Sequence, residues 1–223
     1  MSNVENREGG MNPSGTGLTP DATLCNKDYT QTGVSVRYAF DPDKQWYVLR
    51  ASYGREIKAY DYLLSIGVVA YLPFRQTVRH YGETKKKVRE PLLPNILFVY
   101  CSMKEAETII KFTPELYYLN YYYDHLKRRS DGKNPPLIVD YKQMTNFIML
   151  TSTLDEHIRI IDSSRCHFKS GDRVRVINGN FIGVEGRVAR VAGQQRVVVI
   201  IDGLCSVATA YIPTAFLQQI NNN

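Results

Sequence analysis

The sequence of 223 residues has no apolar run that approaches the roughly 20 residues needed to cross a bilayer. Its first 17 residues are polar and rich in asparagine, glycine and serine, which is unlike a secretory signal. We therefore expect a cytoplasmic protein that makes no membrane contact.

The sequence also has little cysteine, with four residues in all. No two of them have the close spacing of a zinc site, and a chain of this length does not depend on a disulfide framework. We interpret all four as inert or buried thiols: Cys25, Cys101, Cys166 and Cys205.

Signatures of catalysis are missing as well. The four histidines stand in no metal-ligand motif and in no helical motif that contains glutamate. Neither a glycine-rich phosphate loop nor a nucleophile elbow occurs. The sequence therefore predicts no catalytic residue, no metal and no cofactor, and an enzyme with an unrecognised site is the less favoured alternative.

What the sequence does have is an excess of positive charge, with a net charge of +6. Residues 1–43 carry three basic and six acidic side chains, or −3, so the remainder carries +9. That balance suits a partner with negative charge, either nucleic acid or an acidic protein surface.

Composition divides the chain into four parts. Residues 1–44 form a polar leader that we expect to be partly disordered, and residues 151–166 form a linker. Within 45–150, strand and helix patterns alternate without the long repeat of a doubly wound fold, which favours a mixed, mainly antiparallel sheet flanked by helices. Residues 167–221 read as a small all-β domain, so the predicted fold class is α+β.

Local patterns predict individual elements within 45–150. Asp140, followed three residues later by Gln143, resembles a capping box and opens a helix with Met144, Phe147 and Ile148 on its apolar face. The other expected elements are strands at 46–50, 68–72, 95–100 and 116–123, helices at 55–66 and 105–112, and a hairpin with arms at 75–78 and 88–92.

The segment 169–191 reads as two strands around a glycine-rich turn. Residues 173–176 alternate polar and apolar side chains with period two. Asn178-Gly179 tolerates positive φ, and Gly183 and Gly186 mark places where backbones pack closely or bulge. The β-branched run at 196–201 favours strand over helix, so we predict a constitutive β-barrel.

The strand expected at 95–100 is apolar on both faces. Ile96, Phe98 and Tyr100 point to one face, while Leu97 and Val99 point to the other. Such a strand is either sandwiched between helices or leaves an apolar patch that receives a protein partner.

Two basic segments are candidates for nucleic-acid contact. The segment 75–90 carries six basic and two acidic side chains, so its hairpin tip either contacts phosphates or is a solvated loop. Arg55 and Lys58 share one face at a helix start, where cations oppose the helix dipole, which suggests an external anion.

Three segments, taken together and in order, resemble the NusG family. Trp46-Tyr47-Val48-Leu49 resembles the opening strand of the NusG N-terminal (NGN) domain. The segment 90–99, Glu-Pro-Leu-Leu-Pro-Asn-Ile-Leu-Phe-Val, resembles the second signature of that domain, especially as found in the paralogue RfaH. The segment 169–191 resembles the KOW motif. The long polar leader resembles that of the operon-specific NusG-like antiterminators of capsular polysaccharide loci.

The resemblance implies an NGN domain over 45–150, followed by an SH3-like KOW barrel over 167–221. It also implies a monomeric factor that binds the clamp helices of RNA polymerase and promotes processive transcription, here of a polysaccharide operon. The polymerase-binding residues implied are Leu93, Ile96, Phe98, Leu119 and Tyr121.

Further contacts are expected with nucleic acid and with a partner of the KOW domain. Non-template DNA or nascent RNA is expected at Arg55, Lys58 and Tyr62, and at the basic tip formed by Lys85, Lys86 and Lys87. The resemblance implies a ribosomal protein or Rho as the KOW partner, bound through Phe181, Ile182 and Val184. The alternative is an RNA-binding or ribosome-associated KOW protein that does not bind polymerase.

Overall fold

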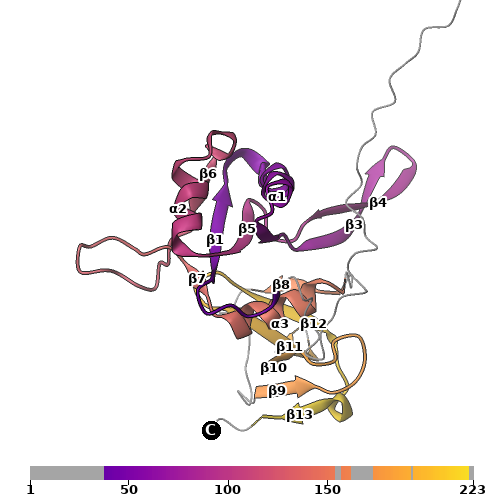
Figure 1. The fold of residues 1–223 in the computed structure, drawn as a ribbon. Helices are drawn as coiled ribbons and strands as arrows, with labels where there is room; N and C mark the ends of the chain where they lie inside the picture. Colours follow the sequence, from indigo (N-terminus) through magenta and orange to yellow (C-terminus); the bar gives the residue numbers. More distant parts are fainter. Residues whose placement is uncertain (1–37, 154–156, 162–172, 192, 221–223) are drawn as a thin grey trace, which may run out of the picture.

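The computed structural model describes residues 38–153, 157–161, 173–191 and 193–220. Most of the predicted leader, part of the predicted linker, and Cys25, Cys166 and His167 lie outside the described residues. Among the described residues there are two sheets, a separate hairpin and three α-helices (Figure 1).

The first sheet has five strands, and β1 lies near its centre. Its order is β2-β5-β1-β6, with β7 also paired to β1, and every pairing is antiparallel. The strands are β1 (Gln45–Ala51), β2 (Val69–Tyr71), β5 (Ile96–Cys101), β6 (Leu119–Tyr121) and β7 (Ile138–Val139). The mainly antiparallel sheet predicted for this region is therefore confirmed.

Two helices, α1 (Glu56–Ser65) and α2 (Met103–Lys111), cover one face of this sheet. After α1 the chain turns at Gly67, whose φ of +78° suits glycine. Ser102 caps α2 in a full capping box with Glu105, which sequence reasoning missed.

The third helix, α3 (Tyr141–Thr151), lies on the opposite face of the sheet (Figure 1). The Asp140 carboxylate accepts hydrogen bonds from the backbone amides of Lys142 and Gln143, as expected of a cap. The prediction of a reciprocal capping box is wrong, because the Gln143 side chain instead binds Asp202 of the second sheet.

The strand expected at 116–123 is shorter than predicted. A 3-10 helix, Pro114–Leu116, occupies its start, and only Leu119–Tyr121 pairs with β1. The hairpin, in contrast, is longer than predicted. Its strands β3 (Phe74–Tyr81) and β4 (Thr84–Pro91) project away from the sheets (Figure 1).

The second sheet forms a small all-β domain, hereafter the β domain. Its antiparallel order is β13-β9-β10-β11-β12-β8, and β11 confirms the strand predicted at 196–201. The strand β8 lies within the segment expected to be a linker. The strands are β8 (Arg159–Ile161), β9 (Arg173–Val176), β10 (Glu185–Val191), β11 (Gln194–Ile201), β12 (Cys205–Tyr211) and β13 (Leu217–Gln219).

Gly186 allows β10 and β11 to approach closely. A Cβ at this position would lie 2.5 Å from the carbonyl oxygen of Val198. The α+β fold class, with a helix-flanked sheet followed by a small domain of barrel-like strands, is therefore confirmed.

Candidate functional site

The apolar strand β5 is buried on both faces. Leu97 and Val99 pack with α1 and α2 in one core cluster. Ile96, Phe98 and Tyr100 belong to a second cluster, which also contains residues of α3 and of the β domain. We call these two sides of the sheet the α1/α2 face and the α3 face.

Aromatic contacts hold α3 against its face of the sheet. The Phe147 ring lies 5.4 Å from the ring of Phe98 and 6.3 Å from that of Tyr71, measured between centroids. The Tyr71 hydroxyl forms a buried hydrogen bond of 2.5 Å with Thr151 at the end of α3. The helix therefore covers Phe98, which has no exposed surface.

The structure divides the five residues expected to bind polymerase between the two faces. Leu93, Ile96 and Phe98 belong to the cluster of the α3 face, where all three are buried. Leu119, which is buried, and Tyr121, which is half-buried, pack on the α1/α2 face. The physical reason is the register, because β1 pairs Leu49 with both Leu97 and Tyr121, and cross-strand partners share a face.

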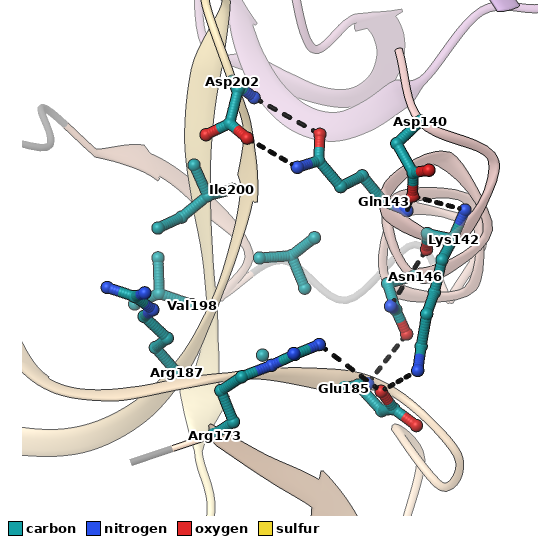
Figure 2. A pocket seen from close by; sticks show the side chains of 12 residues that line it. Asp140, Lys142, Gln143, Asn146, Arg173, Glu185, Arg187, Val198, Ile200 and Asp202 are labelled. Atoms are coloured by element: carbon teal, nitrogen blue, oxygen red, sulfur yellow. Dashed lines mark hydrogen bonds and ion pairs between the residues drawn. The ribbon is translucent and has the colours of Figure 1, made fainter. Parts of the chain in front are cut away.

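The β domain packs on α3 through the shared apolar cluster, and polar contacts add to this packing (Figure 2). The Asn146 side-chain oxygen accepts a hydrogen bond of 2.8 Å from the backbone amide of Glu185. The Gln143 side chain donates to the Asp202 carboxylate at 2.7 Å. These contacts link two successive turns of α3 to β10 and to the end of β11.

Glu185 is the electrostatic centre of this contact. Its carboxylate lies 2.8 Å from Nζ of Lys142 on α3 and 2.6 Å from Nη2 of Arg175 on β9. Arg173 lies further away, at 4.0 Å (Figure 2). Burial by itself raises the pKa of Glu185, but the hydrogen bonds from Lys142 and Arg175 outweigh it and hold the pKa below its usual value. The group is therefore ionised at neutral pH.

The loop expected to contact a KOW partner lies against α3. Phe181 and Val184 are buried, whereas Ile182 is 61% exposed. Gly183 approaches α3 so closely that a Cβ there would lie 2.8 Å from the terminal methyl of Met149. In this arrangement only Ile182 of the three predicted residues is open to a partner.

Arg55, Lys58 and Tyr62 meet in one surface groove at the start of α1, together with Glu115, Tyr117 and Tyr118. Arg55 donates a hydrogen bond of 2.6 Å to the Tyr117 hydroxyl. Its guanidinium carbon lies between 5.2 and 5.7 Å from the ring centroids of Tyr53, Tyr117 and Tyr118. Sequence reasoning did not place Tyr117 or Tyr118 beside Arg55, because Tyr117 is 62 residues away along the chain.

The loop before Arg55 is held in an unusual conformation. Tyr53 has a φ of +62° and is 87% exposed, which an apolar packing role does not explain. The side-chain oxygen of Asn95 accepts a hydrogen bond of 3.0 Å from the amide of Gly54, and its carbonyl accepts one from Ala51. Tyr53 and Tyr117 therefore present two exposed rings beside a cation, an arrangement suited to stacking on nucleic-acid bases.

No group of three metal-ligating side chains occurs among the described residues. Burial raises the pKa of Cys101 and of Cys205 to about 12, so both thiols are protonated at neutral pH. Within the described ranges, no helix is long and apolar enough to cross a bilayer.

Comparison with known proteins gives one family match. Residues 44–120 match the family model described as "Transcription termination factor nusG", and this span contains β1 to β5, α1, α2 and the start of β6. The chain therefore contains a segment of NusG type, which includes Trp46 and the segment 90–99. The match does not extend to α3 or to the β domain.

Among solved structures, the chain is similar to one titled "Domain interaction in Thermotoga maritima NusG". The identity is 21%, the match covers 80% of this chain and 98% of that chain, and the TM-score is 0.36. Because the TM-score is below 0.5, this likeness does not define how the domains are arranged here. No curated protein matches the chain.

Proposed function

We propose that this protein is a non-enzymatic transcription elongation factor that binds RNA polymerase through the α3 face of its first sheet. The observation that carries the proposal is the match of residues 44–120 to the NusG family model. Strand β5 supports the proposal because both of its faces are apolar. One face already forms a core with α1 and α2, so the other is left for a partner. The factor acts in the cytoplasm as a monomer and promotes processive transcription of a polysaccharide operon.

The burial of the α3 face adds a condition to this proposal. Leu93, Ile96 and Phe98 lie beneath α3 and the β domain, so the clamp helices of polymerase gain access only when this covering moves. The contact between α3 and the β domain combines buried apolar side chains with charges and amides, and water replaces only the polar part at a small free-energy difference. Opening this contact also exposes apolar surface of α3 and of the β domain, a cost that polymerase binding has to offset.

Two secondary contacts belong to the same proposal. Arg55, Lys58 and Tyr62, with Tyr53 and Tyr117 beside them, contact the non-template DNA strand or nascent RNA. A ribosomal protein or Rho binds the β domain after Phe181 and Val184 separate from α3, with Ile182 as the part already exposed.

The test is capture of RNA polymerase by the full chain and by Lys142→Glu, which places a second carboxylate beside Glu185. We expect the wild-type protein to capture polymerase and Lys142→Glu to capture more, because repulsion loosens the covering. Lys104→Glu makes the same charge change at an exposed site on α2 and should behave like wild type. An elongation assay through a terminator then measures read-through.

Failure of both wild type and Lys142→Glu to capture polymerase, with folded circular dichroism spectra, would contradict the proposal. Tight, salt-dependent RNA binding in that case would favour the second candidate, an RNA-binding or ribosome-associated protein. The observation that favours this candidate is the exposed basic tip formed by Lys85, Lys86 and Lys87.

A further inference from the structure

The projecting hairpin of β3 and β4 has two chemically different faces. Cross-strand partners place their side chains on the same face of an antiparallel pair. The register pairs His80 with Lys85, Val78 with Lys87 and Gln76 with Arg89, and these six residues form what we call the Lys87 face. The opposite face, the Lys86 face, contains Lys86 paired with Arg79, and Glu90 paired with Arg75.

A carboxylate partly neutralises the positive charge of one of these faces but not of the other. On the Lys86 face, the Glu90 carboxylate lies 2.7 Å from Arg75 and 3.0 Å from Arg79. Both arginines hold the pKa of Glu90 below its usual value, so the carboxylate stays ionised. The Lys87 face contains three cations and no carboxylate among its paired positions.

The cations of the Lys87 face lie in a row along β4. Lys85, Lys87 and Arg89 are exposed, and they alternate along one strand. Two residues of an antiparallel strand advance about 6.8 Å, so the row extends for about 14 Å. Arg89 lies over the Phe74 ring at 4.0 Å from its centroid, which fixes the end of the row nearest the sheets.

We infer that the Lys87 face binds the phosphate backbone of duplex DNA, and that Lys86 takes no part in this contact. A row of unneutralised cations complements a polymer with one negative charge per about 1.7 Å of its axis. Among its described side chains, the Lys87 face has no exposed phenylalanine, tyrosine or tryptophan ring, which favours a duplex backbone over a single strand bound by stacking. The inference rests on the proposed function only for placing the protein beside DNA.

The two adjacent lysines provide a matched pair for the test. Binding of the full chain to a fluorescein-labelled DNA duplex is measured by anisotropy over a series of KCl concentrations. Lys87→Ala should reduce the slope of log K against log[KCl] by about 0.9, and Lys85→Ala with Lys87→Ala by about 1.8. Lys86→Ala removes the same charge one residue away and should leave the slope unchanged.

Equal effects of Lys86→Ala and Lys87→Ala would overturn the inference, and so would a wild-type protein that does not bind the duplex. Stronger binding to single-stranded DNA or to RNA, affected equally by all three lysines, would also overturn it. Polymerase capture by the Lys85→Ala, Lys87→Ala variant is measured in parallel. If this variant still captures polymerase but no longer binds the duplex, the two proposals are separated. Polymerase capture depends on the α3 face, whereas duplex binding depends on the Lys87 face.

Discussion

The two faces of the five-stranded sheet are both buried, but by different chemistry. The α1/α2 face is closed by apolar packing of Leu97 and Val99 against the two helices. The apolar cluster of the α3 face continues from Phe98 through α3 into the β domain, where ions and amides add to the contact. Water competes for the polar contacts but not for the apolar ones. The α1/α2 face is thus closed by apolar packing alone, whereas the covering of the α3 face also depends on polar contacts that substitutions can weaken.

The largest effect is expected from Phe98→Ala, which tests whether the apolar cluster of the α3 face is a true core. Phe98 has no exposed surface and its ring contacts Phe147, so truncation should lower the free energy of unfolding by about 3–5 kcal/mol. Urea titration followed by circular dichroism measures this change. A loss below about 1 kcal/mol would mean that this face packs no more tightly than a free surface.

A smaller effect is expected from Glu185→Gln, which removes the charge at the centre of the polar contacts between α3 and the β domain. Lys142 and Arg175 lose their ionic partner, but both side chains are more than half exposed to water. We therefore expect a loss of about 1–2 kcal/mol, below that of a fully buried pair. Small-angle X-ray scattering should show a larger radius of gyration for this variant, and an unchanged radius would argue against a separable contact.

The same carboxylate predicts a dependence on pH. Because the folded-state pKa of Glu185 lies below its usual value of 4.5, its contribution to stability is complete above that pH and is lost as the pH falls through the folded-state value. Wild type should therefore lose stability in acid more steeply than Glu185→Gln. Urea midpoints measured on both proteins across this range provide the check, and parallel curves would contradict the expectation.

Ser102→Ala tests the α1/α2 face of the sheet independently of the α3 face. It removes the capping box of α2 and should lower the free energy of unfolding by about 1 kcal/mol. Because α2 lies on the α1/α2 face, the radius of gyration at neutral pH should stay at the wild-type value. A more extended particle would show that the two faces are not independent.

The smallest effect is expected from Gln143→Ala, which deletes the exposed hydrogen bonds of 2.7 and 3.5 Å between α3 and Asp202. The free energy of unfolding should fall by only about 0.5 kcal/mol. Amide hydrogen exchange in β11 and β12 is sensitive enough to detect local loosening of the β domain at this level. Unchanged exchange would assign no role to Gln143 in the polar contacts.

Much of the fold was predictable because local patterns agree with it. The double-apolar strand at Ile96, the capped helix after Asp140 and the β-branched run that forms β11 all lie where their patterns place them. The division of the polymerase candidates was not predictable, since the face on which Tyr121 lies depends on its pairing with Leu49. The second role of Gln143 was also hidden, because a glutamine at that position satisfies a capping pattern whether or not it binds elsewhere.

The placement of β8 limits how far the two halves of the molecule can separate. Seven residues, 152–158, connect the end of α3 to β8, and a fully extended chain of that length spans at most about 25 Å. While β8 stays paired to β12, a released β domain therefore remains at high effective concentration and returns readily to α3. The pairing of the short edge strand β8 thus keeps the connecting segment short. If β8 detaches, the connection lengthens to the 21 residues between α3 and β9. The three residues of β8 therefore set how far a released β domain can move from α3 and how fast it returns.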